Sequence, residues 1–115
     1  MCTALEINKI TDEVVSSVLK LMPGKVYKIF LYGSYARGDN TPESDIDIMI
    51  IFDSKEDLDS LTQKSIRKYA SRIGLEMDVV ISLVFSDKVE FLSAQELPFY
   101  QNIRKEGISL YDCNK

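Results

Sequence analysis

Two aspartates separated by one residue open a strongly apolar segment of the sequence. Asp45 and Asp47 lie in the run from 45 to 52, whose other members are isoleucines, a methionine and a phenylalanine. A β-strand turns successive side chains to opposite faces, so both carboxylates fall on one face, about 7 Å apart along the backbone. At about 6 Å and an effective dielectric of ~20, their repulsion is on the order of 3 kcal/mol, which one proton or one cation would relieve.

Carboxylate oxygens, in a chain without histidine, favour magnesium or manganese over zinc as the cation. A second interpretation stays open at this point. Asp45 and Asp47 are equally compatible with a solvated strand start, since aspartate is mostly a surface residue.

A third acid, Asp78, interrupts the apolar stretch from Met77 to Ile81. A buried carboxylate without a partner is costly, so this position predicts either a salt bridge or a place on an edge strand. The alternative is a cup of three carboxylates, in which Asp78 serves as base for an incoming hydroxyl or as a shared metal ligand.

The pair Gly33-Ser34 follows a short β-branched and aromatic run. Glycine lets the backbone approach a ligand closely, and a serine hydroxyl with the free amides of a following helical turn can hold phosphate oxygens. Arg37 could add positive charge to such a phosphate. Each of these residues is equally compatible with an ordinary solvated turn.

The chain has 115 residues, a net charge of -4 and no histidine. A chain of this length buries roughly two-thirds of its unfolded surface, so residues 1–115 are expected to form a single domain. Lack of histidine excludes imidazole-based triads and histidine-containing zinc sites. The acidic balance argues against a broad nucleic-acid surface, although not against a nucleotide neutralised by cations.

The two cysteines, Cys2 and Cys113, lie at opposite ends of the sequence and form no metal-binding pattern. The first residues lack a basic stretch followed by an apolar run, and no segment approaches the roughly 18 apolar residues of a membrane span. We therefore expect a cytoplasmic protein with reduced thiols.

Helical and strand-like patterns alternate along the chain. Helical periodicity runs from Ile7 to Met22, and from a capping box at Asp53 and Glu56 to Gly74. Strands are predicted at 26–32, 45–52, 75–83 and 108–111, a single helical turn at 35–38, and further helix starts at Asp87, Ser93 and Pro98. This alternation predicts an α/β or α+β fold, with a small mixed sheet and helices packed on it.

Gly33-Ser34, ten intervening residues and Asp45-Ile46-Asp47 together resemble the signature of the polymerase-beta-like nucleotidyltransferase superfamily. The longer run GSYARGDNTPESDIDIMI, the acid at Asp78 and the ending NIRKEGISLYD are similar to the minimal nucleotidyltransferases. The resemblance covers nearly the whole chain and implies the nucleotidyltransferase fold.

The resemblance also implies roles for individual residues. Gly33, Ser34 and Arg37 would bind the nucleotide, with Ser34 contacting the triphosphate of ATP. Asp45 and Asp47 would be catalytic ligands of two Mg²⁺ ions, with Mn²⁺ as a substitute. Asp78, the third member of the catalytic and metal-binding set, would help to activate the acceptor hydroxyl.

In the minimal family the acceptor is commonly a separate protein, often a HEPN-domain toxin. The resemblance therefore implies an antitoxin that transfers AMP from ATP to a tyrosine hydroxyl of that toxin. Two alternatives remain: an antitoxin that neutralises its partner by contact alone, and a nucleotidyltransferase for a small molecule such as an aminoglycoside, with a homodimer completing the cleft.

Overall fold

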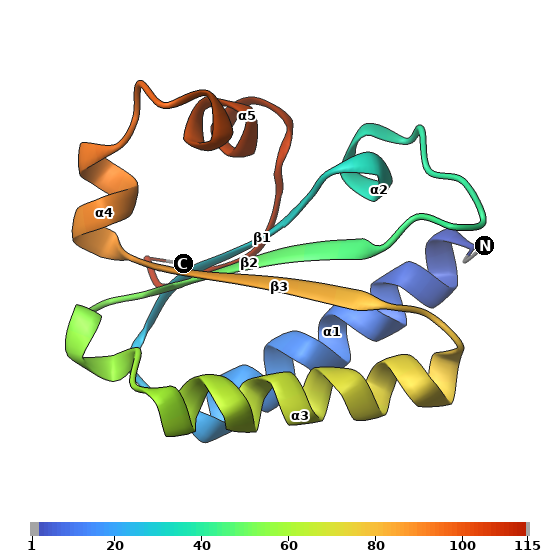
Figure 1. Cartoon of the computed structure of the whole chain (residues 1–115), viewed down its shortest axis with the longest axis horizontal. Coiled ribbons are helices and arrows are strands. Elements are labelled where there is room, and N and C mark those ends of the chain that lie inside the picture. Colours follow the sequence, from blue (N-terminus) through green and yellow to red (C-terminus); the bar gives the residue numbers. More distant parts are fainter. Residues whose placement is uncertain (1–2, 115) are drawn as a thin grey trace.

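The computed structural model describes residues 3–114, which form one four-stranded mixed sheet covered by helices on both faces (Figure 1). The strand order is β3-β2-β1-β4. These strands are β1 (Val26–Tyr32), β2 (Ile46–Phe52), β3 (Ile81–Asp87) and β4 (Ile108–Asp112). Strand β1 is antiparallel to β2 and β4, whereas β2 is parallel to β3. The predicted mixed α/β architecture is confirmed.

The helices divide between the two faces of the sheet. Helices α1 (Ala4–Leu21) and α3 (Ser60–Met77) lie side by side against one face, and α4 (Lys88–Ser93) and α5 (Pro98–Glu106) cover the other (Figure 1). The long helix α3 makes the crossover that a parallel β2-β3 pair requires. A single helical turn, α2 (Ser34–Arg37), follows β1, and a short 3₁₀ helix, η1 (Lys55–Asp57), precedes α3.

Strand β2 is buried on both faces, which explains its nearly continuous apolar sequence. Ile46 and Ile48 belong to the core under α1 and α3. Met49 and Ile51 belong to the second core, which Phe91 of α4 completes. By the alternation of side chains, Asp47 lies on the face of Met49 and Ile51, at the end of the second core.

The predicted end of the second long helix at Gly74 is wrong, because α3 continues to Met77. Gly74 is inside the helix, where a Cβ would lie 2.6 Å from the carbonyl oxygen of Val79. Leu75, Glu76 and Met77 are good helix formers that extend it. The glycine therefore serves close packing of the chain after the helix and does not end it.

Asp78 is consequently not on the third strand, as the sequence predicts, but caps α3. Its backbone adopts the left-handed conformation, φ 56° and ψ 48°, and its N–H donates to the Gly74 carbonyl. Aspartate tolerates this conformation better than most residues. The Asp78 side chain is exposed, so it needs neither the salt bridge nor the edge strand predicted for a buried carboxylate.

The sequence predicts the helix starts with mixed success. Asp87 accepts a hydrogen bond from the Glu90 amide at the start of α4, and Pro98 is in the first turn of α5, as predicted. The capping box at Asp53 and the start at Ser93 are wrong. The side chain of Asp59 accepts from the Thr62 amide and begins α3 instead.

The first helix begins at Ala4, before the predicted Ile7, because Thr3 and Glu6 form a reciprocal capping box. At the other end of the chain, Cys113 is an exposed free thiol, whereas Cys2 lies outside the described residues. Across residues 3–114, no helix has the length and apolar character needed to cross a membrane.

Candidate active site

The turn after β1 carries the Gly-Ser pair. Gly33 has φ 74° and ψ -155°, a conformation reserved for glycine, and it stands at the N-terminus of α2. Its carbonyl accepts from the amides of Ala36 and Arg37. The amides of Ser34 and Tyr35 belong to the first turn of α2, whose N–H groups have no partner within the helix. The predicted single helical turn is therefore confirmed.

The Asp47 carboxylate packs directly against Gly33. A Cβ on Gly33 would overlap Oδ2 of Asp47, so a larger residue at this turn would have to displace the carboxylate. Tyr32, the residue before Gly33, pairs with Asp47 across β1 and β2. The two segments of the predicted signature thus meet in space through a contact between glycine and carboxylate.

Asp45 and Asp47 differ in their surroundings. Asp45 is exposed just before β2, whereas Asp47 is half-buried within it. Burial raises the pKa of Asp47 above its ordinary value, the charge of Asp45 raises this pKa further, and the charge of Arg37 partly offsets both effects. Among residues 3–114, no lysine or arginine forms a salt bridge with either carboxylate.

The phenol of Tyr32 responds to the same charge. Burial, and then the neighbouring Asp47 carboxylate, raise the pKa of Tyr32 to about 12. The ring also packs edge-on against Phe99 of α5, with the ring centroids 5.6 Å apart. Tyr32 therefore packs against the second core and at the same time lies beside the Asp47 carboxylate.

Arg37 lies at the end of α2 between two carboxylates. Its Nε donates to Oδ2 of Asp39 at 3.1 Å, and its Nη1 is 3.6 Å from Oε2 of Glu106, the last residue of α5. The hydrogen bond and charge of Asp39, with a smaller contribution from Glu106, raise the pKa of Arg37. The guanidinium therefore carries a fixed positive charge beside the Asp47 strand.

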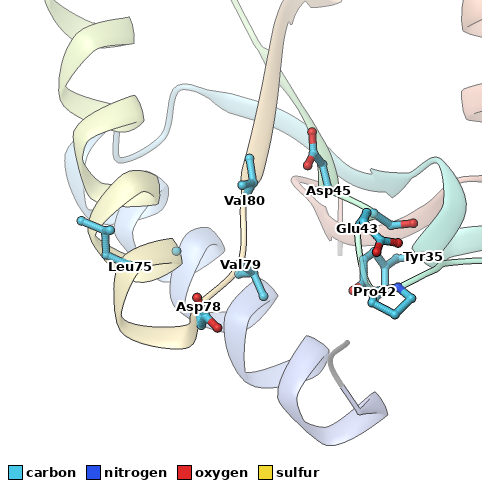
Figure 2. Close-up of a pocket in the computed structure, with 10 residues that line it drawn as sticks. Tyr35, Pro42, Glu43, Asp45, Leu75, Asp78, Val79 and Val80 are labelled. Carbon is cyan, nitrogen blue, oxygen red and sulfur yellow. The ribbon is translucent and has the colours of Figure 1, made fainter.

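Asp78 and Asp45 line one pocket of about 390 Å³, from opposite sides (Figure 2). Figure 2 shows Asp78 at the end of α3 and Asp45 on the segment that leads into β2, with Tyr35 and Glu43 on the same side as Asp45. Within the described part of the chain, no three acidic or cysteine side chains are arranged to hold one metal ion. The expected three-carboxylate cup is therefore not formed, because Asp78 caps a helix instead of lying on β3.

The pair formed by Asp45 and Asp47 fits a hard divalent cation by its donor chemistry. Both groups offer carboxylate oxygens, the ligands that Mg²⁺ prefers. The raised pKa of Asp47 shows that a nearby positive charge would be favourable there, and the protein supplies only the partial offset of Arg37. These two residues are the ones that could hold the metal.

Two neighbours of the site residues are not apparent from the sequence. Glu106 reaches Arg37 only because β4 pairs with β1, and no local pattern indicates that contact. Ser82 of β3 lies opposite Asp47 in the parallel register, and its position depends on where β3 begins. Both depend on strand pairing between distant segments.

The fold and the joined Gly-Ser and Asp-x-Asp segments define a nucleotidyltransferase. Residues 9–110 match the family described as "Nucleotidyltransferase domain", and the chain belongs to this family. Its resemblance to the minimal nucleotidyltransferases is thereby confirmed.

Two relatives come from Methanocaldococcus jannaschii. The chain is 36% identical to "Putative protein adenylyltransferase MJ0604" over 103 residues, which cover 90% of this chain and 96% of the relative. It is 35% identical to "Putative protein adenylyltransferase MJ0141" over 85 residues, covering 73% and 83%. The first of these matches extends over nearly the whole length of both proteins.

Solved structures share the fold at lower sequence identity. A "putative nucleotidyltransferase from Sulfolobus solfataricus" has a TM-score of 0.64 at 21% identity, covering 96% of this chain and 85% of that one. A mutant of the "toxin-antitoxin MntA-HpeT" has a TM-score of 0.57 at 24% identity, covering 88% and 72%. A "toxin-antitoxin with AMP-PNP" has a TM-score of 0.57 at 20% identity, covering 89% and 73%.

Substituting Gly33 tests the contact with Asp47. Gly24 is the matched control, since it also has a positive φ (73°) but no atom within 4 Å of an added Cβ. We expect Gly24→Ala to cost roughly 1–2 kcal/mol, the usual penalty of this backbone region. Gly33→Ala should cost more, because its φ 74° and ψ -155° are reserved for glycine and because the carboxylate must also move. Urea denaturation measures both free energies of unfolding.

A double-mutant cycle separates the overlap from the backbone strain. In the double variant Gly33→Ala with Asp47→Ala, the carboxylate is gone. The double variant's loss in free energy of unfolding should therefore be about 0.5–3 kcal/mol smaller than the sum for the two single variants. Additive costs, or equal costs for Gly24→Ala and Gly33→Ala, would contradict the contact.

The raised pKa of Asp47 predicts that this residue lowers stability at neutral pH. A carboxyl whose folded pKa lies above its ordinary 3.8 favours folding only when protonated, so ionised Asp47 costs stability above that range. In chelator-containing buffer, Asp47→Asn should raise the free energy of unfolding at pH 7, and the gain should disappear as the pH falls through the raised pKa of Asp47 toward 3.8. Asp53→Asn, at the other end of β2, is the control. A loss of stability in Asp47→Asn at pH 7 would refute the prediction.

Proposed function

We propose that this protein is a Mg²⁺-dependent adenylyltransferase that transfers AMP from ATP to a tyrosine hydroxyl of a partner HEPN-domain toxin, and so acts as its antitoxin. The observation that supports this most is the contact of the Asp47 carboxylate with Gly33, which joins the turn and the Asp-x-Asp strand into one site. The relatives named as protein adenylyltransferases support a protein as acceptor. The toxin partner is proposed from the toxin–antitoxin complexes that share the fold.

On this proposal the chain's own residues divide the work of binding. The Ser34 hydroxyl and the first amides of α2 donate to the triphosphate, next to the positive charge of Arg37. Asp45 and Asp47 would hold two magnesium ions. Metal ions held there would supply positive charge to the phosphates and to the leaving pyrophosphate, so the proposed transfer would not require histidine.

Asp78 has a different place in the proposed reaction. It lines the pocket opposite Asp45, where an acceptor hydroxyl could enter between them. Its carboxylate would accept the hydroxyl proton as the tyrosine oxygen bonds to the α-phosphorus and the bond to the β-phosphate oxygen breaks. AMP is then attached to the acceptor, and pyrophosphate leaves.

The test is transfer itself. Purified protein is incubated with ATP, Mg²⁺ and the product of a neighbouring HEPN-domain gene, and intact mass spectrometry follows addition of AMP to the acceptor. We expect modification by the wild type and a loss of at least about 10²-fold in Asp47→Asn, since metal-held charge stabilisation contributes several kcal/mol. Asp53→Asn, outside the site and directly after the same strand, should retain the wild-type rate.

Each contrary outcome identifies a different function. An Asp47→Asn protein that still protects cells from the toxin would indicate neutralisation by contact alone. Transfer of AMP to an aminoglycoside without any partner protein would indicate a small-molecule enzyme. An acceptor that gains no mass while Asp45, Asp47 and Asp78 are intact would refute adenylylation of that partner.

A further inference from the structure

Arg37 is held from two directions by carboxylates that come from different parts of the chain. Asp39 follows it by two residues and binds Nε, whereas Glu106 ends α5 and approaches Nη1. Among residues 3–114, neither Oε1 of Glu106 nor Nη2 of Arg37 takes part in a hydrogen bond or an ion pair. Both N–H groups of Nη2 therefore remain for a further acceptor.

Strand pairing places Glu106 at this turn. Leu31 of β1 is opposite Ile108 of β4, and the strands are antiparallel. Following β1 forward to Gly33 therefore corresponds to following the chain backward from Ile108 to Glu106. A Cβ on Gly107 would overlap the carbonyl oxygen of Ile103, so glycine at this position lets α5 end directly before β4.

The ion pairs contribute little to stability. The side chains of Arg37, Asp39 and Glu106 are 44%, 62% and 37% exposed. Ion pairs as exposed as these typically contribute about 0.2–1 kcal/mol. A carboxylate beside a phosphate-binding arginine also repels the phosphate. Attraction of a nucleotide by charge therefore does not explain why Glu106 lies next to Arg37.

We propose that Glu106 is a positioning residue: by holding Nη1 it orients the Arg37 guanidinium at the turn, so that Nη2 faces the phosphates of a bound nucleotide. This inference rests on the proposed function of Arg37 in nucleotide binding. It adds Glu106, the last residue of α5, to a site otherwise built from the turn and β2.

The sign of the effect on ATP affinity tests the proposal. Removing the negative charge in Glu106→Gln would by electrostatics alone tighten ATP binding, whereas loss of orientation should weaken it. We expect the Kd of Mg·ATP, measured by isothermal titration calorimetry, to rise about threefold to tenfold, with adenosine binding and Tm unchanged. The matched control is Asp112→Asn, which removes one negative charge and the ion pair with Lys28 at the other end of β4.

A second variant tests whether Glu106 acts through Arg37. Arg37→Gln should weaken Mg·ATP binding on its own, and adding Glu106→Gln to it should cause no further loss. Unchanged or tighter ATP binding in Glu106→Gln, while Arg37→Gln weakens it, would overturn the positioning role and leave the proposed function standing. A wild type that binds no Mg·ATP would overturn both.

The free protein offers a readout that does not depend on ATP. The ¹⁵Nη resonances of Arg37 should be distinct and slow to exchange in the wild type and should move toward those of a free arginine in Glu106→Gln, whereas the Nε–H that Asp39 holds should stay in place. Unchanged ¹⁵Nη resonances would refute the hold of Glu106 on Arg37 whatever the protein binds.

Discussion

The structure depends on a pair of carboxylates whose charge the protein does not neutralise. Asp47 is half-buried near the start of β2, and Asp45 lies two residues before it. The Asp47 carboxylate packs against Gly33, where a Cβ would overlap it. Burial and Asp45 both raise the pKa of Asp47, and Arg37 offsets only part of that rise. A fold that keeps such a pair loses stability by it, which is the usual mark of a functional site.

The rest of the fold keeps this pair in place. Strand β2 is packed on both faces, by α1 and α3 on one side and by α4 and α5 on the other, so the position of Asp47 is fixed by two cores. Pairing with β1 brings Gly33 and Tyr32 against it, and pairing of β1 with β4 brings Glu106 to Arg37. The acidic pair, the Gly33-Ser34 turn and Arg37 are thus coupled through the order of the strands.

The parts of the site that could be predicted from sequence are those set by local chemistry. The Gly-Ser turn and the alternation in Asp45-Ile46-Asp47 follow from glycine's conformational range and the two-residue period of a strand. The sequence misplaces Asp78 because Gly74 resembles a helix stop, whereas its lack of a side chain serves packing against Val79. Glu106 could not be predicted, because its contact with Arg37 depends on the register between segments that lie far apart in the sequence.

We propose that Asp45 and Asp47 form a site that a divalent cation completes. Thermal unfolding with and without MgCl₂, against KCl of equal ionic strength, tests this most directly, since screening alone acts equally in both salts. We predict that Mg²⁺ raises the Tm of the wild type above its value in KCl, and that Asp47→Asn abolishes this gain while Asp53→Asn keeps it. Equal Tm values of the wild type in the two salts would contradict a cation site at this pair.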